Sequence, residues 1–200
     1  AGPTFASGAD IRELLKRRAG DALRGINSGL FRQLERFPVP TIAAVNGHAL
    51  GGGCELALAC DLRIAAQSAR FGQPESGLGI IPAAGAAYRL PRIIGLGRAR
   101  EMIYTGRIID AEEALLIGLV NKVVPDDRLL AEARLMASAI ARRGPVAQRI
   151  AKMVLQAAAS GADAAHAAER LGQGILFESA DRDEGMKAFL ARRPPRFRGR

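Results

Sequence analysis

The chain has 200 residues, of which 48% are hydrophobic and 24% charged, and it carries a net charge of +9. This length and composition suit one folded core with a helical appendage and exclude a disordered or fibrous chain. Since no apolar run approaches the roughly 20 residues that cross a bilayer, we expect no membrane-spanning helix and no membrane partner.

The first forty residues are expected to be mostly helical. Asp10 precedes a helix-forming run over residues 11–18 and can cap it by accepting a backbone N–H. Gly20 is expected to end this helix. Apolar residues then recur at spacings of three and four over residues 21–37, which predicts one amphipathic helix that the following prolines end.

The middle of the chain alternates between short strands and helices. Residues 41–47 are β-branched and apolar and close with Asn-Gly, so they predict a buried strand. A loop over 49–53 and a helix over 54–60 follow, and further strands are expected over 61–66 and 119–124. This alternation predicts crossover connections and the α/β fold class.

The character of the chain changes after Pro125. Residues 126–190 are almost all alanine-rich helix, broken at Gly144-Pro145 and again at Ser160-Gly161. We therefore expect two domains, a strand-and-helix core over residues 1–125 and a helical region over residues 126–200.

Three consecutive glycines, Gly51, Gly52 and Gly53, stand just before the helical run. Glycine lets a backbone approach a ligand closely, and the first N–H groups of a helix favour an anion. The phosphate-binding patterns GxxxxGK[ST] and GxGxxG are absent, and Glu55 in the first turn would repel a polyphosphate. The pattern favours a transient oxyanion at a carbonyl, held by the N–H of Gly52.

Two carboxylates are candidates for acid–base chemistry. Glu55 follows the glycines directly, although an acidic residue in a first helical turn is also common for purely electrostatic reasons. Glu75 follows Pro74 on a loop with glycines on either side. Two carboxylates around one water can divide the activation of that water and the transfer of a proton.

Other chemistries receive little support. The two cysteines, Cys54 and Cys60, and the two histidines lack a metal-site spacing, so we expect no metal and read the cysteines as buried hydrophobic residues of a reducing compartment. The positive charge favours anionic partners. Five arginines lie in the last ten residues, and they are expected to form either a solvated tail or a contact with an anion. Because only 4% of residues are aromatic and Trp is absent, nucleic acid is an unlikely partner.

Three segments carry a resemblance to a known family. "TFASGADIREL", "VPTIAAVNGHALGGGCELALACDLRIAAQSARFGQPESGLGIIP" and "DEGMKAFLARRPPRF" resemble the enoyl-CoA hydratase/isomerase (crotonase) superfamily, nearest to its enoyl-CoA hydratases and AU-binding methylglutaconyl-CoA hydratases. The resemblance implies a ββα spiral core and a C-terminal helical region that drives assembly into a homotrimer or a hexamer.

The start of the chain is abrupt by comparison with this family. The chain opens without Met, and the family's opening ββαβ segment is absent, so we expect the N-terminal part of the spiral to be missing. A bacterial cytoplasmic location is the expectation, with organelle targeting left open for the same reason.

The resemblance also implies the reaction. The backbone N–H groups of Ala9 and Gly52 would hold the thioester oxygen, while Glu55 and Glu75 would add water across the 2,3 double bond of a 2-enoyl-CoA thioester. CoA is part of this substrate, so no cofactor is expected. The alternatives are an enoyl-CoA isomerase or another acyl-CoA enzyme of the superfamily and, outside catalysis, an RNA-binding protein.

Two further features concern the binding of the substrate. The family usually shows "IPGAGGTQRL" where this chain has "IPAAGAAYRL", so Ala83 replaces a glycine beside the water site and would be strained at positive φ. Arg192 and Arg193 are expected to contact the CoA phosphates. The length and branching of the acyl chain cannot be read from these residues.

Overall fold

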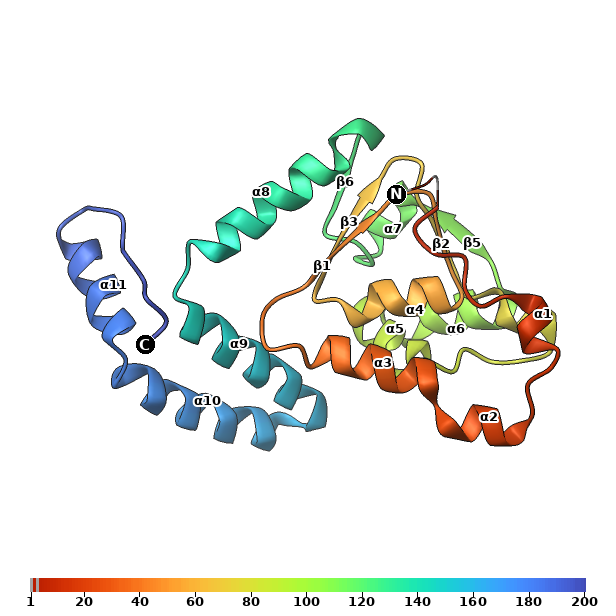
Figure 1. Cartoon of the computed structure of the whole chain (residues 1–200), viewed down its shortest axis with the longest axis horizontal. Coiled ribbons are helices and arrows are strands. Elements are labelled where there is room, and N and C mark those ends of the chain that lie inside the picture. The colour runs from red at the N-terminus through yellow and green to blue at the C-terminus, as the bar shows by residue number, and fades with distance from the viewer. Residues whose placement is uncertain (1, 3) are drawn as a thin grey trace. The chain divides into compact units, whose positions relative to one another are not determined.

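The computed structural model describes residue 2 and residues 4–200 (Figure 1). The chain forms two compact units, one built from the residues up to Phe37 together with Thr41–Arg134, the other from Pro38–Pro40 and Leu135–Arg200. The change from one unit to the other falls within helix α8 (Leu129–Ala141). The division that the composition predicts, at residue 125, lies just before this helix.

The first unit contains two small sheets. The strands of one are β1 (Ile42–Val45), β3 (Leu62–Ala66) and β6 (Lys122–Val124), all parallel and in the order β1-β3-β6. The strands of the other are β2 (His48–Leu50), β4 (Arg70–Gly72) and β5 (Ile108–Asp110), with β2 and β4 parallel and β5 antiparallel to β4. The α/β class and the three strands predicted over 41–47, 61–66 and 119–124 are confirmed.

The prediction of a loop over 49–53 is wrong in its first half, because β2 occupies that position. Ala6 pairs with this strand: the Ala6 N–H donates to His48 O, and the Leu50 N–H donates to Ala6 O. A three-residue strand directly beside three glycines is too short to show a period of two. Its hydrogen bonds come from partners distant in the sequence.

Seven α-helices are assigned before α8 in the described part of the first unit. They are α1 (Ile11–Leu14), α2 (Ala19–Arg24), α3 (Ile26–Glu35), α4 (Gly52–Ala59), α5 (Ala86–Ile94), α6 (Leu96–Thr105) and α7 (Ala111–Leu116), and the short 3-10 turns η1 (Pro74–Leu78) and η2 (Asp126–Arg128) accompany them. The core that packs them is apolar and includes the fully buried Ile64, Phe71 and Leu90. Helix α4 contacts α3, α5 and β2, so the helix is held on several sides.

The single helix predicted over residues 21–37 is wrong. Gly25 takes a left-handed conformation with φ 57°, which ends α2 and starts α3 in a new direction. Gly20 lies inside α2 rather than ending a helix. The cap at Asp10 is confirmed, because its side chain accepts from the N–H of Arg12.

Arg63 is a buried side chain that fixes the far end of α4. It is 6% exposed and donates to the carbonyl oxygens of Ala57 and Cys60 at the C-terminus of α4 and to Leu119 O. Burial lowers the pKa of this guanidinium. A cation at the C-terminal end of a helix complements the negative end of the helix dipole.

The second unit is helical. Beyond α8 it contains α9 (Pro145–Ala157), η3 (Ala158–Ser160), α10 (Ala162–Phe177) and α11 (Ala180–Leu190) (Figure 1). The breaks predicted at Gly144-Pro145 and Ser160-Gly161 are confirmed, and Ser179 adds another by capping α11. Within residues 2 and 4–200, no helix is long and apolar enough to span a membrane.

Candidate active site

A cavity of about 580 Å³ opens in the first unit at the N-terminus of α4. Its walls include Ala9, Gly52, Glu55, Glu75 and Ala83, so five of the seven predicted site residues line one space. Much of the remaining wall is apolar and includes Ile11, Leu14, Phe31, Leu56, Leu78, Ile80 and Ile81.

The three glycines before α4 have different roles. Gly51 has φ 52°, and a Cβ on it would lie 2.9 Å from Oε1 of Glu75. A Cβ on Gly53 would collide with the backbone oxygen of Ala6. A Cβ on Gly52 would meet only the Cα of Gly8, at 3.7 Å. Packing therefore requires glycine at 51 and 53, whereas position 52 faces free space.

The backbone amides of Ala9 and Gly52 belong to residues that line the same cavity, and both are unpartnered in the described chain. Neither donates a hydrogen bond to any part of the chain that the structure describes. Gly8 lies against the start of α4, since a Cβ on it would be 3.5 Å from the nitrogen of Gly52. A free donor at the positive end of a helix, with a second free donor in the wall of the same cavity, can stabilise a developing oxyanion.

Glu55 is held by the loop that precedes α5. It is 3% exposed, and its Oε1 accepts from the N–H of Ala84 at 2.7 Å and from the N–H of Ala86 at 3.0 Å. No ion pair to Glu55 occurs among residues 2 and 4–200. The two amides fix the carboxylate in the cavity wall without neutralising it by a cation.

Glu75 lies in η1 and is 8% exposed. Burial raises the pKa of its carboxyl, and the negative charge of Glu55 raises it further. The fully buried amide of Gln73, oriented to satisfy both of its polar atoms, donates to the two oxygens of Glu75 at 3.2 and 3.1 Å. Gln73 was not predicted as a site residue, although it stands two residues before Glu75 in the segment "FGQPESGLG".

The prediction of backbone strain at Ala83 is wrong, because its φ is not positive. Among the described residues, Arg192 is the one non-glycine residue with positive φ, and the loop places that conformation at Gly85, with φ 121°. Ala83 is exposed and lines the cavity, while the amides that reach Glu55 belong to Ala84 and Ala86.

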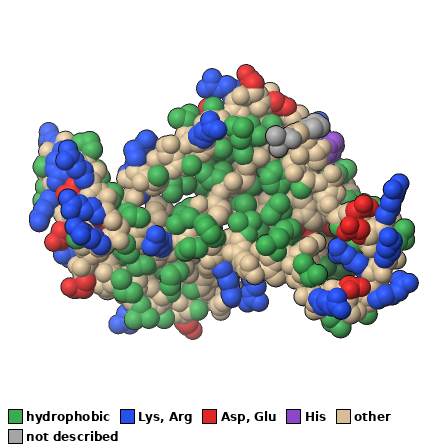
Figure 2. Space-filling view, viewed as in Figure 1, with side chains coloured by type: hydrophobic (Ala, Val, Ile, Leu, Met, Phe, Trp, Pro, Cys, Tyr) green, Lys and Arg blue, Asp and Glu red, His purple; other side chains and the backbone are tan. Residues whose placement is uncertain are grey.

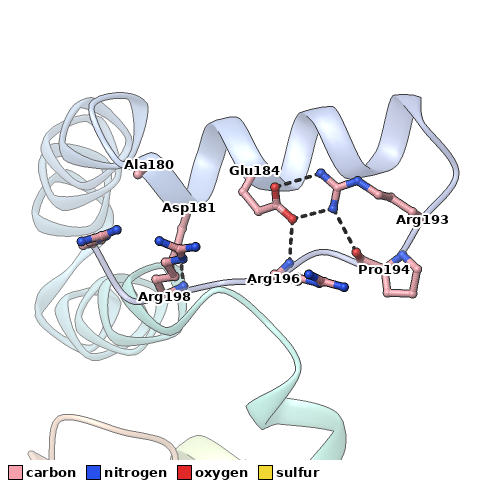
Figure 3. A pocket seen from close by; sticks show the side chains of 8 residues that line it. Ala180, Asp181, Glu184, Arg193, Pro194, Arg196 and Arg198 are labelled. Atoms are coloured by element: carbon pink, nitrogen blue, oxygen red, sulfur yellow. Dashed lines mark hydrogen bonds and ion pairs between the residues drawn. The ribbon is translucent and has the colours of Figure 1, made fainter.

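Arg192 and Arg193 lie in the second unit and do not line this cavity. The guanidinium of Arg193 is bound by Glu184 through two hydrogen bonds of 2.6 and 2.9 Å (Figure 3). This pairing lowers the pKa of Glu184 to about 2. The contact of Arg192 and Arg193 with CoA phosphates stays a prediction.

A second cavity, of about 690 Å³, lies between α11 and the C-terminal tail. The tail runs back along α11 because its backbone N–H groups donate to two carboxylates, from Arg196 to Glu184 and from Arg198 and Gly199 to Asp181 (Figure 3). Lys and Arg side chains gather at the surface of this end of the second unit (Figure 2). Here the carboxylates anchor the chain.

Metal-binding and thiol chemistry lack a site in the described chain. Over residues 2 and 4–200, no three His, Cys, Asp or Glu side chains form a group that could hold a metal ion. Cys54 is buried, and this burial raises the pKa of its thiol to about 12. A thiol with this pKa stays protonated and is a poor nucleophile near neutral pH.

Comparison with known proteins places this geometry in a family. Residues 1–200 match the family described as Enoyl-CoA hydratase/isomerase. The chain belongs to this family. It is 45% identical over 197 residues to a crotonyl-CoA hydratase of Syntrophomonas wolfei, covering 97% of this chain and 76% of that protein. It is 44% identical to a 2,3-dehydroadipyl-CoA hydratase of Escherichia coli, covering 98% and 77%.

A solved structure agrees with the sequence relatives. An enoyl-CoA hydratase from Bacillus anthracis has a TM-score of 0.95 and 42% identity to this chain, covering 100% of this chain and 79% of that one. The crotonase-type fold that the quoted segments imply is confirmed. The relatives also confirm the expected class: the chain is an enzyme of the enoyl-CoA hydratase type, a hydro-lyase.

Proposed function

We propose that the chain hydrates the 2,3 double bond of a 2-enoyl-CoA thioester. The observation that carries this proposal is that one cavity combines two buried carboxylates, Glu55 and Glu75, with the two unpartnered amides of Ala9 and Gly52. The names of the relatives agree with it, since several are hydratases of enoyl-CoA thioesters.

The two amides would bind the thioester oxygen. Hydrogen bonds from Ala9 and Gly52 withdraw electron density from the conjugated system and make Cβ electrophilic. As water adds, negative charge moves to the thioester oxygen, where the amides and the dipole of α4 stabilise it. A donor of this kind contributes about 3 kcal/mol to the stability of the transition state.

The two carboxylates would divide the proton transfers. Glu55, held by the loop amides, accepts a proton from water while the water oxygen forms its bond to Cβ. Glu75 gives its proton to Cα, which completes the addition, and the two carboxyl groups then exchange protons with solvent to reset. The raised pKa of Glu75 supports its role as the donor.

CoA enters as part of the substrate, so this reaction requires no separate cofactor. The apolar residues of the cavity wall would contact the acyl chain. Of the two tail arginines, Arg193 is paired with Glu184, so a contact with CoA phosphates would fall first to Arg192.

The second candidate reaction is the movement of a double bond. An enoyl-CoA isomerase/hydratase of Mycosarcoma maydis is 41% identical to this chain over 211 residues. Isomerisation moves a proton between two carbons and needs no activated water. The presence of both carboxylates in one cavity supports hydration as the main reaction.

We further propose that the chain assembles as a homotrimer or a hexamer. Large apolar side chains are exposed on α8, α9 and α10, among them Leu130, Leu135, Met153, Leu155, Leu171 and Ile175, and apolar groups are visible at the surface of these helices (Figure 2). Such residues are typical of an interface. Light scattering of the purified chain measures the assembly directly.

The test of the reaction is a direct assay. The purified chain is mixed with crotonyl-CoA and with longer 2-enoyl-CoA esters, and the loss of the conjugated thioester absorbance is followed. We expect hydration of at least one chain length. Folded protein that hydrates none of them contradicts the proposal, and conversion of 3-enoyl-CoA esters without hydration would assign the isomerase reaction instead.

A further inference from the structure

We propose that Arg89 is a positioning residue, which holds the loop over residues 84–86 in the shape that presents two amides to Glu55. This inference rests on the proposed function, in which Glu55 activates the water. Arg89 lies on α5, is 3% exposed and does not line the cavity. Among the described residues, its side chain is connected to Glu55 through the backbone of Ala84.

A continuous chain of hydrogen bonds connects α3 to the carboxylate. Nη2 of Arg89 donates to Oε2 of Glu35 on α3 at 2.8 Å, and Nη1 donates to the carbonyl oxygen of Ala84 at 2.8 Å. The N–H of Ala84 donates to Glu55 at 2.7 Å. Ala84 is thus held by its carbonyl on one side and holds Glu55 with its amide on the other. Hydrogen bonds in such a chain strengthen one another.

The loop is folded around the guanidinium. Gly85 has φ 121°, and a Cβ at this position would collide with Nη1 of Arg89. The ring of Tyr88 covers the guanidinium, with its centroid 4.7 Å from Cζ. The guanidinium donates to Ala84 and Glu35 from two separate nitrogens of a rigid fork, a geometry that the single nitrogen of a lysine reproduces only in part.

The chemistry of the site gives this arrangement a measurable consequence. Without Arg89, the carbonyl of the buried Ala84 loses its donor, and the loop is free to turn its amides away from Glu55. A shift of about 1 Å in a reacting group can cost about 100-fold in rate. The amides of Ala9 and Gly52 lie on other segments, so substrate binding is expected to persist.

The experiment compares Arg89→Met and Arg89→Lys with Arg92→Met. Arg92 is a matched control, because it is exposed on the same helix and its Cζ lies 5.5 Å from the centroid of the same Tyr88 ring. We expect Arg89→Met to lower kcat by about 10- to 100-fold with KM changed by less than about twofold. Arg89→Lys should recover part of this loss, and Arg92→Met should leave kcat unchanged.

A double variant separates positioning from general structure. In a Glu55→Gln background, Arg89→Met should cost no more than about a further twofold in kcat, because both changes act on the same group. Losses that multiply in the double variant would overturn the proposal. Wild-type kcat in folded Arg89→Met or Arg89→Lys would overturn it as well.

A readout without substrate keeps the two proposals distinguishable. Hydrogen exchange at the amides of Ala84 and Ala86 should accelerate in Arg89→Lys, which retains the charge and tests the idea even where Arg89→Met does not fold. Unchanged exchange at both amides would contradict positioning. A wild-type chain that hydrates no enoyl-CoA ester would contradict the proposed function, while the exchange result still decides the role of Arg89.

Discussion

The cavity at the start of α4 and the cavity beside α11 each contain two carboxylates that accept hydrogen bonds from N–H groups of the chain. Beside α11, Glu184 also binds the guanidinium of Arg193, and its pKa falls to about 2. At α4, Glu55 and Glu75 are more deeply buried than Glu184, no cation of the described chain pairs with either, and the pKa of Glu75 is raised.

This difference separates two uses of the same chemical group. A carboxylate neutralised by arginine is a stable anchor, and its proton is held too weakly for exchange at neutral pH. A buried carboxylate without a cation has an environment in which a proton can be gained or lost, which acid–base chemistry requires. The proposed function would account for the energetic cost of burying Glu55 and Glu75 together, which stability alone does not explain.

The largest expected effect comes from removing either carboxylate at α4. Glu55→Gln and Glu75→Gln should each lower kcat for enoyl-CoA hydration by about 10²- to 10⁴-fold, because general acid–base catalysis contributes this much. Steady-state kinetics measure the loss, and Glu184→Gln, with its carboxylate outside the α4 cavity, is the control. A Glu55→Gln variant with normal kcat would contradict the acid–base role that distinguishes the α4 cavity from the cavity beside α11.

The next largest effect concerns the amide of residue 52. Gly52→Pro deletes the N–H at the first position of α4, where proline is tolerated, and should lower kcat by about 10²- to 10³-fold. Gly52→Ala retains the N–H, and its Cβ meets only Gly8 at an ordinary distance, so it serves as the matched control. Equal activity in these two variants would show that the amide is not used.

A smaller and reversible effect is the titration of the carboxylates, which carbon NMR of labelled glutamate can follow. Glu75 should titrate above the ordinary value of 4.5 and Glu184 far below it, near 2. Glu55→Gln removes a negative neighbour, so the pKa of Glu75 should fall while that of Glu184 stays. A Glu75 midpoint at or below 4.5 would contradict its role as proton donor.

The same pairing makes the docking of the tail depend on pH. Because the pKa of Glu184 is depressed in the folded chain, its contribution to stability is present above about 4.5 and is lost as the pH falls toward about 2. Proton NMR of the Arg196 amide, which donates to Glu184, should report this release. An Arg196 signal that stays constant down to pH 2 would contradict the anchor.

The smallest expected effect is the low reactivity of the Cys54 thiol in the folded chain. Because burial raises the pKa of its thiol to about 12, thiol reagents should label it only after unfolding. Mass spectrometry after alkylation under native and denaturing conditions measures this. Cys60, which is half-buried, gives the comparison within the same helix region.

The pattern of the sequence was sufficient for the features that depend on neighbouring residues. The strands at 42–45 and 62–66, the cap at Asp10 and the helix breaks in the second unit all follow from local composition. The break at Gly25 was missed because the apolar period continues across it, and the period carries no information on the sign of φ.

The sequence predicted several residues that line the candidate site, but it did not predict which residues contact them. The glycines and the two glutamates were found from motif and chemistry, but Gln73, Arg89 and the amides of Ala84 and Ala86 act through tertiary contacts. The pairs are separated by as many as 54 positions, as between Arg89 and Glu35. No local period or spacing reports a contact of that kind.

Arg63 lies at the C-terminal end of α4, opposite the end that borders the cavity. By donating to the carbonyls of Ala57 and Cys60, it holds the C-terminal end of the helix in place. In the proposed mechanism, peptide dipoles held in this way would need little reorganisation, which is the condition under which fixed dipoles stabilise a transition state better than water does. On the proposed mechanism, we therefore expect even an arginine at the far end of the helix to contribute to the rate.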